Sequence, residues 1–349
     1  MKLNRVLLIA VFALVVSGCQ SVYYYGQAID GQLSILMQRV PIAEILDDPR
    51  ASAKLKKRLS LILEIREFAQ NELHLPVKKN YLSYVDLQRP YVVWNVFAAP
   101  EFSLTPKTWC YPIVGCVAYR GYFSEQDARR YAASLKKNYD VYVGGVSAYS
   151  TLGWFDDPVL STIMHLTETE STALIIHELT HQLLYVPDDT AFNESFATAV
   201  EQEGVRRWLE GRSDPDAHDA YLQNFRQHRQ FVDLIMKYRR RLESLYQTEA
   251  SATAKRKHKA RLFYQLKQDH DTLKNQWNGT SRYDRWFNPS LNNAQFVSVL
   301  TYQDLVPAFV GLLRQNDGDL EQFYDECQAL AKKSKTERHQ RLSAYKEHN

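Results

Sequence analysis

The chain has 349 residues, of which 45% are hydrophobic, so it is long enough to bury a sizeable core in one large domain. Its 43 Lys and Arg against 40 Asp and Glu give a formal net charge of +3. Nucleic acid is excluded as an expected partner, because such binding rests on a basic surface that neutralises phosphates.

The first residues have the layout of an export signal. Lys2 and Arg5 precede Val6–Val16, an apolar run of eleven residues that is too short to span a bilayer. The sequence "VSGC" (residues 16–19) resembles a bacterial lipobox, which implies a lipoprotein signal peptide over residues 1–18 and lipidation of Cys19. The alternative is an uncleaved signal anchor with a chance cysteine. No later segment is apolar enough to cross a membrane.

These features predict the location of the mature chain. Gln20, directly after the cysteine, resembles the pattern of lipoproteins sorted to the outer membrane. We therefore expect a lipid-anchored protein of the bacterial cell envelope, in the outer membrane and facing the periplasm. Residues 19–30 are expected to form a lipidated N-terminus and a short tether, and residues 31–349 the globular domain. Removal of residues 1–18 leaves 41 basic against 40 acidic side chains.

The spacing of apolar residues divides the body into three parts. Residues 22–75 place them at three- and four-residue intervals, which predicts helices. Residues 81–155 carry β-branched and aromatic runs broken by Pro and Gly, which predict strands, with one helix near Ser124–Asn138. The rest is helical, in residues 167–210, which carry the metal motif described below, and in a C-terminal part over residues 216–349. This order predicts a predominantly helical α+β fold, with a small antiparallel or mixed sheet packed on the active-site helix.

Two features lie outside the metal motif. Residues 238–268 resemble a long helical hairpin, whose basic side chains either contact anionic lipid or phosphate groups or form a solvated helix face. Cys110 and Cys116 lie six residues apart, so they either form a disulfide across a tight hairpin in an oxidising periplasm or remain buried free thiols. Cys327 is expected to be a small core residue. The cysteines lack the spacing of a metal site.

The strongest motif is HExxH, formed by His177-Glu178-Leu179-Thr180-His181. A capping box of Thr167 with Glu170, followed by apolar residues, predicts that the motif lies on a helix. Residues four apart share a helix face, so both imidazoles can reach one metal ion. Glu178 then lies beside the ion without binding it, where a general base for a water molecule belongs. The alternative is a buried histidine pair whose partners are carboxylates.

Two histidines do not complete a zinc site, so a third ligand is required. If the first helix runs to Tyr185, it climbs about 6 Å past His181 before a proline ends it and Thr190 caps a second helix. Four residues along the second helix, the chain returns to the level of the imidazoles, which places Glu194 opposite them. Asp189 is the alternative ligand, although a residue inside the turn is expected to lie above the ion.

The HExxH motif followed by Asn193-Glu194-Ser195-Phe196-Ala197 is similar to the gluzincin pattern, in which a glutamate supplies the third ligand. The gap of twelve residues between His181 and Glu194 is shorter than in thermolysin-like enzymes. A wider set of segments resembles the bacterial Putative aminopeptidase family of predicted zinc lipoproteins: "YPIVGCVAYRGYF", "AYSTLGWFDDPVLST", "HELTHQ", "NESFA" and "NNAQFVSVLTYQDLVPAF". The resemblance implies a zincin-like fold, one Zn²⁺ ion on His177, His181 and Glu194, and aminopeptidase activity.

Peptide hydrolysis also needs a hydrogen-bond donor for the oxyanion, often a tyrosine, and Tyr149 and Tyr302 are the candidates. The segment Ser147–Phe155 is expected to be a strand, which either runs along the cleft and pairs with extended substrate or is an ordinary sheet strand. Glu201 lies seven residues after the third ligand, on about the same helix face. It either orients a zinc histidine or is a surface glutamate beside Arg206.

The substrate is expected to be a peptide or protein. For an aminopeptidase, Asp156, Asp157 or Glu125 could bind the substrate's α-ammonium group, and nothing in the sequence selects among them. The alternatives are a zinc endopeptidase that acts on envelope proteins or peptides, and a non-catalytic lipoprotein that zinc stabilises. Glu178 favours catalysis, because a structural site has no use for a carboxylate beside two histidine ligands. The sequence does not indicate an oligomeric state.

Overall fold

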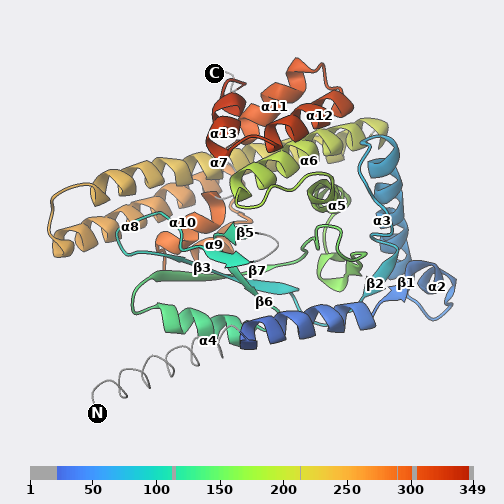
Figure 1. The fold of residues 1–349 in the computed structure, drawn as a ribbon, viewed down its shortest axis with the longest axis horizontal. Helices are drawn as coiled ribbons and strands as arrows, with labels where there is room; N and C mark the ends of the chain where they lie inside the picture. Colours follow the sequence, from blue (N-terminus) through green and yellow to red (C-terminus); the bar gives the residue numbers. More distant parts are fainter. Residues whose placement is uncertain (1–21, 112–114, 213, 289, 301–304, 346–349) are drawn as a thin grey trace, which may run out of the picture.

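The computed structural model describes residues 22–111, 115–212, 214–288, 290–300 and 305–345. Most of this part of the chain is helical (Figure 1). The first helices are the N-terminal helix over residues 22–37, α2 (Ile42–Asp47), α3 (Ala53–Asn71) and α4 (Glu125–Leu135). The later ones are η1 (Ser161–Ile163), α5 (Glu168–Leu183), α6 (Thr190–Arg212), α7 (Pro215–Tyr246), α8 (Ala252–Gln276), α9 (Asp284–Phe287), α10 (Asn293–Leu300), α11 (Val306–Gln315), α12 (Leu320–Ala331) and α13 (Lys335–Ser343).

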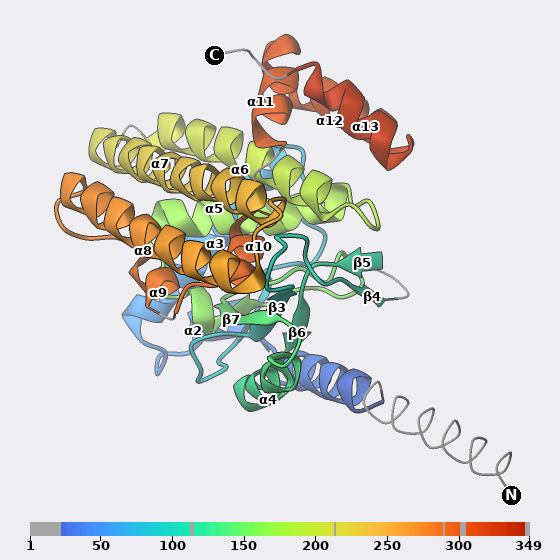
Figure 2. The ribbon, with the colours of Figure 1, turned by 90° about the vertical axis from the view of Figure 1, so that its left-hand side faces the viewer.

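The centre of the molecule is the pair α5 and α6. Both helices carry apolar residues at three- and four-residue intervals, such as Ile176 and Leu179 on α5 and Phe196 and Val200 on α6, and all four are buried. Helix α3 packs on α5, and α11 packs on α6 (Figures 1 and 2). The two central helices approach closely at Gly204, where an added Cβ would lie 2.7 Å from the Ile176 side chain. The core therefore fixes α5 and α6 against each other.

The strands form small sheets. They are β1 (Val40–Pro41), β2 (Ser83–Val85), β3 (Val93–Ala99), β4 (Trp109–Tyr111), β5 (Gly115–Val117), β6 (Arg120–Tyr122), β7 (Asp140–Val146) and β8 (Val159–Leu160). The antiparallel sheet has the order β6-β3-β7, the mixed sheet the order β1-β2-β8, and β4 pairs with β5. The α+β, mainly helical fold is confirmed. The antiparallel sheet packs on α4 and α10, whereas α5 packs mainly on α6 and α3. In the mixed sheet, Val159 of β8 lies in the same core cluster as Ile175 and Leu179 of α5.

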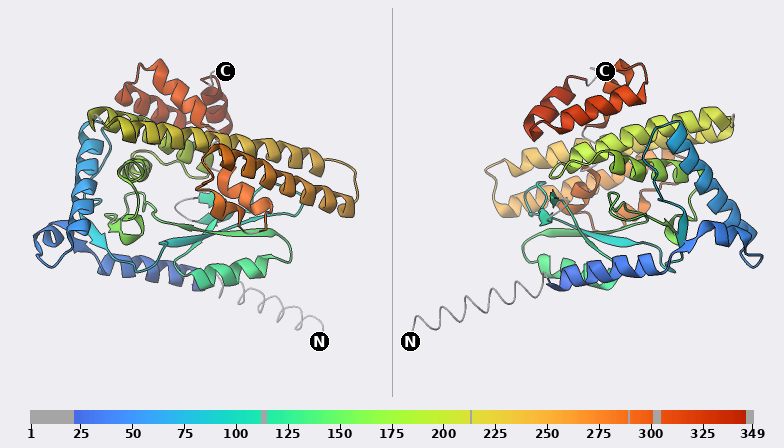
Figure 3. Two further views of the ribbon diagram at one scale, coloured as in Figure 1. Left: turned by 180° about the vertical axis from the view of Figure 1, so that it is seen from behind. Right: turned by 45° about the vertical axis from the view of Figure 1, so that its right-hand side comes forward.

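The N-terminal helix includes most of the segment over residues 19–30 that is expected to be a tether, and it agrees with the helical spacing predicted from residue 22 onward. Residues 22–30 belong to this helix, which lies along one edge of the molecule in Figures 1 and 3. Phe123 N donates a hydrogen bond to Gln27 Oε1 at 3.0 Å, and Ile35 is buried. The expected signal peptide and Cys19 lie outside the described residues. Within the described ranges, no helix is both long enough and apolar enough to span a bilayer.

The segment before α5 is irregular where a strand was expected. Residues 147–155 have no strand assignment, and Asp157 provides the physical reason. Its carboxylate accepts hydrogen bonds from Thr151 N at 3.0 Å and Thr151 Oγ1 at 2.7 Å. These bonds fold the chain back on itself, and Leu152 takes a positive φ of 55°. Local side-chain bonds to the backbone thus compete with a strand ladder.

The structure also bears on the cysteines and the long hairpin, and it selects the disulfide from the two alternatives for Cys110 and Cys116. Cys110 and Cys116 face each other on β4 and β5 and are joined in a disulfide. Cys327 is a buried free cysteine on α12. Helices α7 and α8 form the predicted long hairpin, in which Asp269 on α8 accepts from Lys237 on α7 at 2.7 Å. An open depression of about 630 Å³ between these helices is lined by basic side chains that include Arg240.

Candidate metal centre

Helix α5 begins and runs as the sequence indicates. Thr167 and Glu170 form the predicted capping box, which satisfies the first backbone N–H groups of the helix. The helix ends at Leu183, two residues before the expected end at Tyr185. The rings of His177 and His181, one helical turn apart, have centroids separated by 4.9 Å. Both imidazoles therefore face the same side of α5.

The turn between α5 and α6 corrects one expectation. Asp189 caps α6, because Phe192 N donates to its Oδ1 at 3.3 Å and Asn193 N donates to its carbonyl at 3.1 Å. Thr190 is instead the first residue of the helix. Asn193 holds the turn closed through hydrogen bonds of 2.8 Å to both the N and the O of Val186. The second helix consequently starts in a fixed direction.

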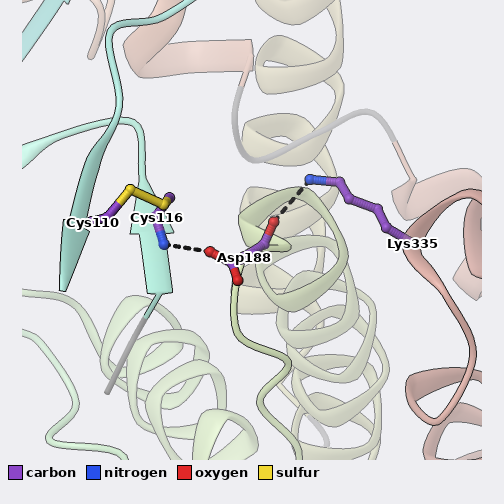
Figure 4. The surroundings of a disulfide bond; sticks show 4 residues. All are labelled: Cys110, Cys116, Asp188 and Lys335. Atoms are coloured by element: carbon purple, nitrogen blue, oxygen red, sulfur yellow. Dashed lines mark hydrogen bonds between the residues drawn. A yellow bond between two sulfur atoms is a disulfide. The ribbon is translucent and has the colours of Figure 1, made fainter. Parts of the chain in front are cut away.

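Asp189, the alternative third ligand, points away from the histidines. Its carboxylate lies 2.7 Å from Arg338 Nη2 and 2.9 Å from His339 Nε2, both on α13. The neighbouring Asp188 joins two other parts of the chain (Figure 4). Its Oδ1 accepts from Cys116 N at 2.6 Å, and its carbonyl accepts from Lys335 Nζ at 2.9 Å. The turn is thus held between the disulfide hairpin and the last helix.

Glu194 lies opposite the two histidines. Its Oε2 is 3.3 Å from His177 Nε2 and 3.7 Å from His181 Nε2. One ligand atom from each of the three residues lies within 4.8 Å of the others. The two helices therefore bring together three residues that can hold a metal ion, and the geometry expected for Glu194 is present.

The ring nitrogens of His177 and the carboxylate of Glu194 are arranged as ligands for a cation. Glu201 Oε2 lies 3.0 Å from His177 Nδ1, which places the proton of a neutral imidazole on Nδ1. The Nε2 of His177 then carries a lone pair and faces Glu194 Oε2, which is also an acceptor. Two acceptors 3.3 Å apart require a proton or a metal ion near both. Glu201 thus stands where a residue that orients a ligand histidine is expected.

The charges of the group are strongly coupled. Burial alone raises the pKa of Glu194, but the charges and hydrogen bonds of His181 and His177 outweigh it and lower the pKa to about 2. Burial opposes protonation of His177, whereas Glu194 and Glu201 raise its pKa well above the usual value. The carboxylates of Glu194 and Glu201 thus favour a positive charge between them, which either a proton on His177 or a metal ion can supply.

Glu178 is the third polar group of the motif. The residue is buried, with 9% of its surface exposed, and it lines the same cavity as the two histidines. Burial raises the pKa of Glu178, and the nearby His177 and His181 partly offset this effect. A carboxylate with a raised pKa beside a candidate metal position can accept and return a proton.

The cavity has a volume of about 510 Å³ and is enclosed by several parts of the fold. Tyr24 comes from the N-terminal helix, Asn95 and Gly121 from the antiparallel sheet, and Ala148 from the irregular segment before α5. Although that segment is not a strand, it does run along the cavity. The lining includes residues of the sheet as well as His177, His181 and Glu194, so a substrate that fills the cavity would contact both.

Of the tyrosines in the described lining of the cavity, sequence reasoning named Tyr149 and missed four: Tyr24, Tyr111, Tyr119 and Tyr185. Tyr119 and Tyr185 both line the cavity near Glu194. Burial is the main cause that raises the pKa of each tyrosine, and the charge of Glu194 is the second cause. The pKa of Tyr185 is raised to about 12. Tyr185 follows the HExxH motif by four residues, a spacing that could have indicated it. Tyr149 also lines the cavity, but its hydroxyl donates to Gln32 Oε1. Tyr302 lies outside the described residues.

The three candidates for binding an α-ammonium group are absent from the described lining of the cavity. Glu125 is on α4 and pairs with Arg129 at 2.6 Å. Asp157 is buried and accepts hydrogen bonds from Thr151, and burial raises the pKa of its carboxyl. Asp156 precedes it in the same loop and does not line the cavity either. Among the described residues, the carboxylates that line the cavity are Glu178 and Glu194.

The fold and the site define a class of protein: a mainly helical α+β chain with a His-His-Glu group, able to hold a metal ion, on two consecutive helices. The family model described as "Putative aminopeptidase" matches residues 23–342, which is most of the chain. The protein belongs to this family. No curated protein and no solved structure matches it.

Proposed function

We propose that the protein is a zinc-dependent peptidase of zincin-like fold. The observation that supports this most strongly is the convergence of His177 Nε2, His181 Nε2 and Glu194 Oε2 beside the buried Glu178. Two imidazoles and a carboxylate are a ligand set that suits Zn²⁺ and leaves a position for water. Membership of a family described as aminopeptidases supports a peptide substrate.

The roles of the residues follow from their positions. A zinc ion held by His177, His181 and Glu194 would supply a Lewis acid that polarises a water molecule and the substrate carbonyl. Glu178 takes the proton of the attacking water and passes it to the leaving amine, which its raised pKa favours. Tyr119 or Tyr185 donates a hydrogen bond to the oxyanion. Tyr149 is less suitable, because its hydroxyl already donates to Gln32 Oε1.

We also propose that the chain is anchored in the bacterial envelope through a lipid on Cys19. The support is the run from Lys2 to Cys19, which has the charged start, apolar stretch and small residues of a lipoprotein signal. An outer-membrane location facing the periplasm follows from Gln20. The disulfide between Cys110 and Cys116 is compatible with such an oxidising compartment.

An endopeptidase is the second candidate, and one observation favours it. An aminopeptidase needs a group that recognises a free α-ammonium, usually a carboxylate. In the described lining of the cavity, both carboxylates already have roles at the metal centre, because Glu194 is a ligand and Glu178 is the base. A substrate that passes through the cavity without a free amino terminus needs no further carboxylate.

The test combines metal analysis with one substitution. We expect Glu178→Gln to retain one zinc ion per chain and to lose at least 10³-fold in turnover, because the base is removed while the ligands remain. Glu210→Gln, which changes an exposed carboxylate on α6, is the matched control and should behave as wild type. Wild-type hydrolysis by Glu178→Gln would refute the proposed base. Peptides with free and blocked amino termini distinguish the two activities.

A further inference from the structure

The N-terminal helix has an apolar face that the described body does not cover. Five apolar side chains point outward, with exposed fractions between 42% and 79%: Val22, Tyr25, Ile29, Leu33 and Met37. Their spacing of three and four residues places them on one side of the helix. We call these five residues the outer face. In Figures 1 and 3 the helix lies at the edge of the molecule, and the exposure of the five side chains shows that the outer face is turned away from the body.

The opposite side of the helix packs against the body of the protein. Ile35 is buried in a cluster with Val92, and the Tyr24 ring stacks on Tyr111 with centroids 5.7 Å apart. Asp30 is the single charged residue between positions 22 and 37. A surface helix of a water-soluble protein normally carries charged residues outward, whereas a helix that is apolar on all sides is buried or lies in a membrane. An exposed apolar stripe of this kind marks a site of contact with a membrane or another protein.

Further exposed apolar residues lie at the C-terminal end of this helix: Val40, Leu82, Trp154 and Phe155. Two hydrogen bonds hold these segments next to each other. Arg39 Nη1 donates to Asp156 O at 3.1 Å, and Ile42 N donates to Leu82 O at 2.9 Å. Tryptophan and tyrosine are enriched where a protein meets the headgroup region of a bilayer. The composition of the patch is that of a membrane-interface surface.

We propose that the outer face lies in the interface of a lipid bilayer, with the N-terminal helix parallel to the membrane. The argument for a bilayer over another occupant is the chain that precedes the helix. Cys19 is three residues before Val22, and the apolar run Val6–Val16 lies before it. A lipid on Cys19 or a retained apolar run places a membrane anchor within about 10 Å of the outer face. This inference rests on the membrane anchoring proposed above.

Such docking has a consequence for the site. Tyr24 and Ala28, on the inner side of the same helix, line the cavity of the metal centre. A helix with its side chains is about 10–12 Å across, so the cavity lies about one helix diameter from the membrane surface. The docked orientation would present the site to proteins or peptides that are held at the membrane, as well as to those in solution.

The experiment uses the full chain reconstituted in vesicles of phosphatidylethanolamine and phosphatidylglycerol. A fluorophore is attached to Ile29→Cys or Leu33→Cys, and to Tyr264→Cys on α8 as an equally exposed control. The unsubstituted chain gives the background, since Cys327 is buried. We expect brominated acyl chains to quench the labels at positions 29 and 33 at least three-fold more than the label at 264. Equal quenching at all three positions overturns docking.

Flotation of the same vesicles separates the two proposals. A chain that floats with its vesicles but shows equal quenching retains the anchor and loses the docked helix. A chain that does not float overturns both. Peptide hydrolysis in detergent tests the proposed peptidase activity independently of either result.

A second variant tests whether another copy of the chain covers the outer face. We expect Ile29→Glu with Leu33→Glu to abolish the quenching of a label at Trp154→Cys while the chain still floats. The control is Leu222→Glu on α7, which should leave that quenching unchanged. Sedimentation of the lipid-free protein should show the same mass for wild type and variant. A wild-type dimer that the double substitution dissociates would overturn membrane docking.

Discussion

At the scale of single residues, Glu201 determines which nitrogen of His177 faces the other ligands. Its carboxylate lies 3.0 Å from Nδ1 and leaves Nε2 directed at Glu194. We expect Glu201→Ala to weaken metal affinity by about 10–100-fold, because the imidazole loses its fixed orientation and tautomer. Competition with a chromophoric chelator measures the change. The control is Glu210→Ala on the same helix, and equal affinity of Glu201→Ala and wild type would contradict the assigned role.

Glu194 makes the metal-free protein sensitive to acid. Its pKa is lowered to about 2, below the value of about 4.3 for an unfolded glutamate. The stabilisation is therefore fully present above pH 4.3 and is lost as the pH falls through 2. It amounts to at most about 3 kcal/mol, given 1.36 kcal/mol per pKa unit. Urea unfolding at pH 5 and pH 2.5 should show a smaller pH dependence for Glu194→Gln, and an unchanged dependence would contradict this prediction.

At the scale of elements, the start of α6 depends on α13. Arg338 lies 2.7 Å from the buried Asp189 carboxylate, and its guanidinium stacks over Phe192 at 5.1 Å. We expect Arg338→Ala to lower the free energy of unfolding by about 3–5 kcal/mol, because it leaves the Asp189 charge buried without its main partner. Arg341→Ala, which breaks the exposed pair with Glu337, should cost less than about 1 kcal/mol in the same urea titrations.

The elements around the motif were largely predictable. The apolar spacing and the Thr167 capping box indicated α5, and the proline-containing turn indicated that a second helix returns with Glu194. The cap of that helix was not predictable, because Asp189 is selected over Thr190 by Arg338 and His339, about 150 residues further along the chain. The irregular segment after β7 was also missed, since the hydrogen bonds from Thr151 to Asp157 override its strand-like composition.

At the scale of the whole molecule, metal binding should stabilise a protein that is already folded. The three ligands lie on α5 and α6, whose packing against each other and against α3 and α11 does not involve the metal. Removal of zinc with a chelator should therefore lower the melting temperature by roughly 5–10 °C, the effect of about 4 kcal/mol of binding energy, without loss of helical circular dichroism. His181→Ala should abolish the difference between the zinc-loaded and zinc-free proteins.

The three-dimensional arrangement of these elements was harder to predict than their type. The expected tether over residues 19–30 is, from residue 22 onward, a helix whose inner side completes the cavity. Its apolar residues gave the helical spacing, but the spacing alone could not show that Tyr24 packs on Tyr111. Tyr119 could not be distinguished from the other tyrosines among the 22 in the sequence. Its place in the cavity lining depends on the three-dimensional arrangement of the sheet and α5, which the sequence does not show.

The contacts of Asp188 and Asp189 also bear on when a newly made chain can form the candidate metal site. All three ligands have been synthesised by residue 194, yet the turn that joins their helices is braced by Lys335, Arg338 and His339 near the end of the chain. A ribosome releases those last residues only when translation is almost complete. A nascent polypeptide thus has the three candidate ligands long before it has the contacts that hold their turn, so we expect the metal site to form only after the end of the chain has folded.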